Sequence, residues 1–167
     1  MGLLQPEMAL PHILIVDERV HALRSLSGAL RAAHPEWNVS AVDSPVRAVA
    51  LIEREPVDVV ITEAVFDEMR GARFVAWLAE RDPDLPCLIL TERPDLAPRR
   101  SVSPNVQRVL LKPAQMDVLE ACVARALRAR QTARQAPIER VEPRPIVSAV
   151  AWSTPLFAVD RAIRSGR

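Results

Sequence analysis

The chain has 167 residues, of which 49% are hydrophobic and 26% charged, and a formal net charge of +1. These values suit one globular domain with a tail, and the near-neutral charge argues against a general nucleic-acid partner. Cys87 and Cys122 lie inside apolar segments, which is typical of reduced thiols in a cytoplasmic protein. The amino-terminal residues do not resemble a signal peptide, and no segment is long enough to span a membrane, so we expect no membrane association.

The first half of the chain alternates between apolar runs and amphipathic segments. Strands are predicted at His12–Val16, Trp37–Val42 and Val57–Ala64, because short runs rich in Val and Ile are typical of buried strands. Helices are predicted from about Val20 to Ala33 and from Pro45 to about Arg54, the second with Ser44 as its N-cap.

The second half continues the pattern with one interruption. A helix through Phe74 and Ala79 is followed by a strand at Cys87–Leu90 that ends in Thr91. Three prolines between Glu92 and Asn105 then predict that a helix there is short or missing.

A fifth strand at Val106–Leu111 and a last helix from Met116 to about Arg130 complete the predicted domain. This order predicts an α/β fold, a doubly wound parallel sheet of five strands with right-handed crossovers.

Polar side chains follow four of the predicted strands. They are Asp17 and Glu18, Glu63, Thr91, and Lys112. Because the carboxyl ends of parallel strands meet at one edge of the sheet, we expect these residues to lie together. Grouped carboxylates bind hard divalent cations, while a hydroxyl and an ammonium bind phosphoryl oxygens. Each residue alone would be read as a helix cap or a solvated charge, and their common placement favours a site.

With these motifs, residues 11 to 130 resemble the receiver domain of two-component response regulators, a CheY-like domain with a flavodoxin-like fold. The matching motifs are Ile13-Leu14-Ile15-Val16-Asp17-Glu18, Val59-Val60-Ile61-Thr62-Glu63, Met69-Arg70-Gly71, Leu90-Thr91 and Leu111-Lys112-Pro113. The resemblance implies that Asp17 and Glu18 form an acid pocket for Mg²⁺ and that Glu63 stands at the phosphoacceptor position. It also implies that Thr91 and Lys112 sense the phosphorylated state.

Glu63 departs from the family, which has aspartate at this position. The extra methylene moves the carboxylate by about 1.5 Å, and a misplacement on the order of 1 Å can slow in-line transfer about 10²-fold. We therefore expect no phosphorylation: either Glu63 imitates the phosphorylated state, or the site has decayed and Glu63 pairs with Lys112. Three carboxylates this close together raise one another's pKa, unless a cation or Lys112 compensates. We expect Asp17, Glu18 and Glu63 to keep weak Mg²⁺ binding without phosphorylation.

Two further departures concern the readout surface. The family usually has an aromatic switch residue three positions before the lysine, and Val109 stands there with neither the bulk nor the hydroxyl for that role. The family's fourth helix falls in the proline-containing segment, where Arg93, Arg99 and Arg100 would suit an acidic partner.

The predicted domain boundaries are an N-terminal extension at residues 1–11, a receiver-like domain at 12–130, a linker at 131–145 and an apolar segment at 146–167 that suits a short helix. Four arginines give the last helix a basic end: Arg125, Arg128, Arg130 and Arg134. A solvated helix terminus explains them better than DNA binding.

These observations predict an atypical receiver domain that acts through protein–protein interaction, with no catalytic role of its own. Its partner would be a histidine kinase, a downstream effector or a second copy. Two alternatives stay open: a working phosphorelay receiver, and a transcriptional regulator that acts through the C-terminal tail.

Overall fold

The computed structural model describes residues 9–66, 71–98 and 103–135. Within these ranges five strands form one parallel sheet in the order β2-β1-β3-β4-β5. The strands are β1 (His12–Val16), β2 (Asn38–Val42), β3 (Val59–Thr62), β4 (Cys87–Thr91) and β5 (Val106–Leu111). The predicted five-stranded parallel sheet is confirmed.

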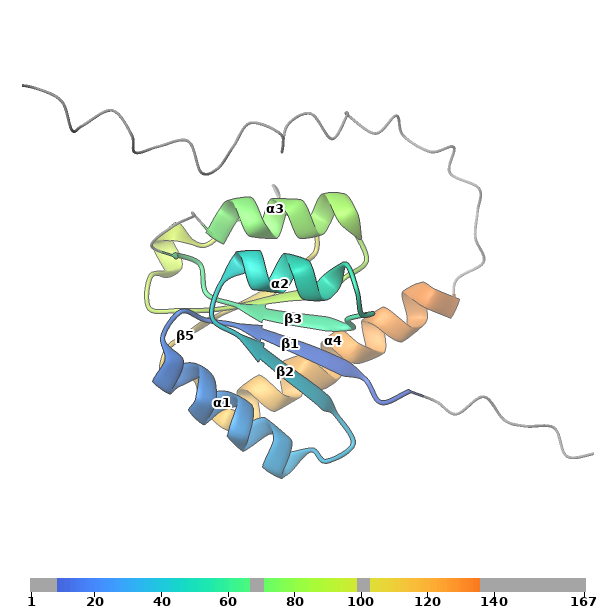
Figure 1. Cartoon of the computed structure of the whole chain (residues 1–167), viewed down its shortest axis with the longest axis horizontal. Helices are drawn as coiled ribbons and strands as arrows, with labels where there is room; N and C mark the ends of the chain where they lie inside the picture. Colours follow the sequence, from blue (N-terminus) through green and yellow to red (C-terminus); the bar gives the residue numbers. More distant parts are fainter. Residues whose placement is uncertain (1–8, 67–70, 99–102, 136–167) are drawn as a thin grey trace, which may run out of the picture. The chain divides into compact units, whose positions relative to one another are not determined.

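Helices cover both faces of the sheet, as Figure 1 shows. On one face lie α1 (Val20–Ala33) and α4 (Met116–Gln135), and on the other lie α2 (Pro45–Ile52) and α3 (Gly71–Arg81). Each face has its own hydrophobic core. This arrangement confirms the doubly wound fold.

β1 shows why its sequence is apolar throughout. All five of its residues are buried. Ile13 and Ile15 belong to the core on the α1 and α4 face, while Leu14 and Val16 belong to the opposite core. Because successive strand side chains point to opposite faces, a sheet covered on both sides requires an uninterrupted apolar strand.

The element boundaries differ from prediction by one or two residues. β2 begins at Asn38, because the Trp37 N–H donates to the His34 carbonyl at 3.0 Å in the turn before the strand. β3 is limited to Val59–Thr62, although Val57 and Ala64 beyond its ends are also buried. α2 ends at Ile52, and its predicted cap is confirmed, since the Ser44 hydroxyl accepts a hydrogen bond from the Arg47 N–H.

α4 continues past Arg130 to Gln135, so the prediction that a linker begins at residue 131 is wrong. Two ion pairs attach this end of the helix to the domain: Arg130 pairs with Asp82 after α3, and Arg134 pairs with Asp58 before β3 at 2.5 Å. The compact unit correspondingly ends at Gln135. The predicted apolar segment at 146–167 and most of the N-terminal extension lie outside the described residues.

The connection from β4 to β5 contains a single turn of 3₁₀-helix, η1 (Pro94–Leu96), within the described residues. Pro94 stands at its start, a position that needs no N–H donor, and no α-helix is found in the described part of the connection. The prediction of a short or irregular fourth helix is confirmed for these residues. Arg99 and Arg100 lie outside them.

Two remaining expectations concern the thiols and the membrane. Cys87 and Cys122 are both free, and burial raises the pKa of the Cys87 thiol to about 12, so it is unreactive at neutral pH. None of the helices in the described ranges has the length and apolar character needed to cross a bilayer.

Candidate functional site

The carboxyl edge of the sheet carries the predicted site. β1, β3, β4 and β5 present Asp17, Glu63, Thr91 and Lys112 there, each at the end of its strand or one residue beyond it. The parallel topology brings these positions together although they are far apart in the chain. Asp17, Glu63 and Lys112 make direct side-chain contacts.

Lys112 lies between the two carboxylates. Its Nζ donates hydrogen bonds to Asp17 Oδ2 at 2.5 Å and to Glu63 Oε2 at 2.7 Å. The side chain of Lys112 is 12% exposed, that of Asp17 is 9% exposed and that of Glu63 is 6% exposed. The cluster is therefore shielded from bulk water. Glu63 thus pairs with Lys112, a contact expected under one of the two interpretations of Glu63.

Backbone amides bind the other two carboxylate oxygens. Asp17 Oδ1 accepts a hydrogen bond from the Arg19 N–H at 2.9 Å, and Glu63 Oε1 accepts one from the Ala64 N–H at 2.7 Å. Each of the four oxygens therefore has a donor, and Lys112 offsets one of the two negative charges. Buried charges are stable only with this kind of pairing and hydrogen bonding.

The carboxylates predicted to bind Mg²⁺ are Asp17, Glu18 and Glu63. Within the described ranges no group of three or more His, Cys, Asp or Glu side chains is placed to bind a metal. The Lys112 ammonium lies between Asp17 and Glu63, two of the three carboxylates predicted to bind Mg²⁺. Glu18 is half-buried beside Asp17.

Thr91 is fully buried at the end of β4. Its hydroxyl accepts a hydrogen bond from the Arg93 N–H at 3.0 Å, and its carbonyl accepts one from the Lys112 N–H at 2.8 Å. The hydroxyl thereby closes the turn after β4, while the backbone of Thr91 fixes the backbone of Lys112. The role predicted for Thr91 as a sensor of phosphorylation stays a prediction.

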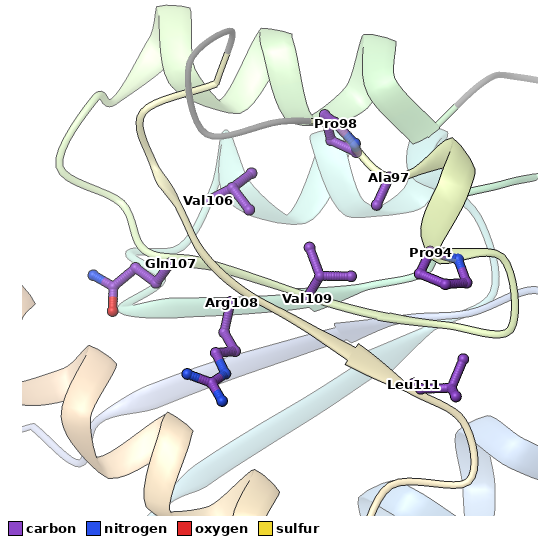
Figure 2. Close-up of a pocket in the computed structure, with 8 residues that line it drawn as sticks. All are labelled: Pro94, Ala97, Pro98, Val106, Gln107, Arg108, Val109 and Leu111. Carbon is purple, nitrogen blue, oxygen red and sulfur yellow. The ribbon is translucent and has the colours of Figure 1, made fainter.

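Val109 lies on β5 with 37% of its surface exposed. It has no group able to form a hydrogen bond with the site, and it faces a hollow beside η1 (Figure 2). The absence of an aromatic switch at this position therefore leaves an apolar surface in its place.

An ion pair that the sequence did not reveal crosses the site. The Arg19 guanidinium donates to both carboxylate oxygens of Glu92. Arg19 follows β1 and Glu92 follows β4, and these strands flank β3, so the pair spans the end of the strand that carries Glu63. The hydrogen bond from Arg19 lowers the pKa of Glu92. The only sequence signal was that both residues directly follow predicted site residues.

Gly71 has a structural role that was also missed. A Cβ at this position would lie 2.3 Å from the Ala64 carbonyl oxygen and 2.9 Å from the Glu63 carbonyl oxygen. α3 therefore begins in direct contact with the backbone that positions Glu63, and only glycine permits this approach. The signal was present in the sequence, since Gly71 is one of only four glycines.

Comparison with protein families agrees with this arrangement. A model of the response regulator receiver domain family matches residues 13–124. The transcriptional regulatory protein GlrR of Escherichia coli K12 is 30% identical over 119 residues, which cover 70% of this chain and 26% of GlrR. The probable transcriptional regulatory protein TcrX of Mycobacterium tuberculosis is 30% identical over 81 residues, 48% of this chain and 34% of TcrX. The chain thus spans about a quarter to a third of the length of these relatives.

Solved structures show the same fold. The signal receiver domain of an HD domain-containing protein from Pseudomonas fluorescens Pf-5 has a TM-score of 0.70 and 23% identity, covering 82% of this chain and 98% of that one. The response regulator TrrA from Thermotoga maritima, solved with Mg²⁺ and BeF, has a TM-score of 0.62 and 18% identity, covering 70% and 99%. The family match over residues 13–124, supported by the topology and the strand-end residues, shows that the chain belongs to the response regulator receiver domain family.

Proposed function

We propose that this chain is an atypical receiver domain that signals by binding a protein partner and is not phosphorylated. The observation that carries the proposal is the position of Lys112, which bonds both Asp17 and Glu63 in a buried cluster. A histidine kinase or a downstream effector is the class of partner that family membership suggests. We propose no catalytic role.

Glu63 is poorly placed to accept a phosphoryl group. Both of its oxygens already accept hydrogen bonds, one from Ala64 and one from Lys112. A carboxylate that attacks phosphorus must free one oxygen and align it with the leaving group, and the longer side chain displaces that oxygen by about a bond length. Glu63 instead holds Lys112 in one position, which gives the edge a permanent charge arrangement.

Mg²⁺ binding is proposed to be weak for the same reason. Receiver domains commonly bind this ion, and TrrA was solved with it. Here a divalent cation would have to displace the Lys112 ammonium from Asp17 and Glu63, so the two cations compete for the same oxygens.

A phosphorylation assay tests the proposal. The full chain is incubated with acetyl phosphate and Mg²⁺ and then analysed by intact mass spectrometry. Phosphorylation would form a bond between phosphorus and a Glu63 carboxylate oxygen and release acetate. We expect no added phosphoryl group on the wild type or on Glu63→Gln, and partial modification of Glu63→Asp, which shortens the side chain to the family's length.

A typical receiver domain phosphorylated in parallel shows that the reagents work. A phosphoryl group on the wild type that is absent from Glu63→Gln would overturn the proposal and favour the phosphorelay alternative.

A further inference from the structure

β5 is the last strand of the sheet, and its outer edge has no neighbouring strand in the part of the chain that the structure describes. The Lys112 N–H donates to the Thr91 carbonyl of β4. Because backbone N–H groups alternate in direction along a strand, the N–H groups of Leu111 and Val109 point away from the sheet. Two hollows lie along this strand: one beside the short η1 turn, and one between β5 and α4.

The first hollow is apolar and has a volume of about 460 Å³. Figure 2 shows Val106 and Val109 of β5 facing Ala97 and Pro98 across it. Pro94 and Leu111 complete its apolar lining, and Leu111 is 60% exposed. A surface of this kind gains free energy when an apolar side chain covers it.

The second hollow is basic and has a volume of about 340 Å³. It lies between β5 and α4 and is lined by Leu88, Gln107, Arg108, Cys122, Arg125 and Ala129. Arg108 and Arg125 have no ion-pair partner among the described residues, unlike Arg130 and Arg134 of the same region. Two uncompensated guanidinium groups beside one hollow favour a carboxylate ligand.

The two hollows lie on opposite faces of β5. Arg108 pairs with Leu88, which belongs to the core on the α4 face, while Val109 pairs with Ile89 of the opposite core. Gln107 and Arg108 line both hollows, so the hollows meet at the strand edge. A strand added to this edge would direct its alternate side chains into the two hollows in turn.

We propose that the β5 edge binds an extended segment of a partner protein in which apolar and acidic residues alternate. The segment adds a sixth strand, its apolar side chains cover Val109 and Leu111, and its carboxylates pair with Arg108 and Arg125. This inference deepens the proposed function as a protein-binding module and rests on it. An arginine on an edge strand also discourages aggregation between edges; that role alone predicts no preference for acidic peptides.

The test uses the full ¹⁵N-labelled chain and a synthetic peptide of alternating valine and glutamate, matched to the six residues of β5. Binding is followed by NMR, and the Val109 and Leu111 amide protons are expected to shift and to exchange more slowly with water. Arg108→Glu and Arg125→Glu should each weaken binding by about fivefold. Arg128→Glu is the matched control, because Arg128 is exposed on the same helix and lines neither hollow.

Two control peptides decide the mode of binding: one replaces glutamate by lysine, and one groups the valines and the glutamates into separate blocks. Equal binding of either control, or no binding of the alternating peptide at millimolar concentration, would overturn the inference. If the peptide does not bind and the chain is also not phosphorylated by acetyl phosphate, this inference is wrong but the proposed function stands. If the peptide binds but the chain is phosphorylated, the proposal that the domain works without phosphorylation is wrong and this inference stands.

Discussion

Lys112 lies between two buried carboxylates, and its charge offsets part of theirs. Taking three charged groups out of water is costly, and the cost is tolerated only while each group keeps its partners. Lys112 therefore contributes to stability as well as to the proposed function, and it is the residue through which the two roles can be separated.

Replacing Lys112 with Met keeps most of the side-chain volume and removes the charge. We expect the free energy of unfolding to fall by about 3–5 kcal/mol, because the two carboxylates are left close together and unpaired. Mg²⁺ should restore part of this loss by binding between them, and should stabilise the variant more than the wild type. Urea unfolding with and without Mg²⁺ measures both effects.

Arg47→Met provides the control for that measurement. Arg47 pairs with Asp43 on the surface, where the two side chains are 70% and 39% exposed. Its loss should change stability by about 1 kcal/mol or less. Equal responses of Lys112→Met and wild type to Mg²⁺ would show that Lys112 does not compete with the metal.

Two glycines give a matched pair of substitutions. Gly71→Ala should destabilise the fold by about 1–3 kcal/mol, because the new methyl group meets the Ala64 carbonyl at 2.3 Å. Gly28→Ala, within α1, should raise the free energy of unfolding by about 0.5–1 kcal/mol. An added Cβ at this position would have no other atom within 4 Å, and alanine has a higher helix propensity than glycine. Thermal unfolding of both variants compares them. A neutral Gly71→Ala would mean that α3 shifts freely away from the Glu63 backbone.

At the scale of elements, α4 is attached at its C-terminal end to two other parts of the domain. Arg130 pairs with Asp82 after α3, with one hydrogen bond of 2.9 Å, and Arg134 pairs with Asp58 before β3. Asp58 also accepts a hydrogen bond from the His12 N–H at 2.8 Å, which ties the beginning of β1 to the same group. Two of the four arginines at this end of α4 are therefore used internally, which weakens the case for a DNA-binding surface.

The Arg130–Asp82 pair should be sensitive to acid. Burial opposes the charge on Asp82, but the hydrogen bonds and positive charge of Arg130, together with the Asp84 N–H and the charge of Arg134, outweigh it and lower the pKa of Asp82 below its usual 3.8. The stabilisation is complete above that value and is lost as pH falls through the lower pKa of the folded state. Arg130→Met should remove this acid dependence and cost about 1–3 kcal/mol, towards the lower end because Asp82 is partly exposed.

Hydrogen exchange of residues 126–135 measures the effect on the last turns of α4. Arg128→Met is the control on the same helix, because the Arg128 side chain is exposed and only its carbonyl accepts a hydrogen bond, from the Thr132 hydroxyl. Faster exchange in Arg130→Met but not in Arg128→Met is the expected result. The same rates in both variants would mean that the ion pair does not hold the helix end.

At the scale of the whole molecule, the sheet order places the site. β3 is central, with β1 and β4 beside it, so Glu63 is surrounded by residues from its neighbours. β5 is at the edge, and this places Lys112 where its side chain reaches back across β4 to the carboxylates. One strand thus contributes both the cation of the buried cluster and the exposed edge proposed to bind a partner.

Much of the architecture followed from the sequence. Uninterrupted apolar runs such as Ile13–Val16 predicted strands buried on both faces, and the alternation of strand and helix predicted the parallel sheet. The polar residues at the strand ends predicted which side chains meet. These features follow from local rules, in which the period of apolar residues reports burial and the position of a residue on its strand reports the sheet edge.

Other features were decided only by tertiary structure. Lys112 bonds both carboxylates, and Arg19 pairs with Glu92 across β3; these contacts join residues far apart in the chain. The end of α4 at Gln135 was also not predicted. Nor was the close approach of Gly71 to the backbone of Glu63 and Ala64. Such contacts depend on distances of a few tenths of an ångström between separate elements, and residue types alone carry no information on that scale. The sequence by itself determined which groups meet at the edge of the sheet, and packing decided which of them are bound to one another.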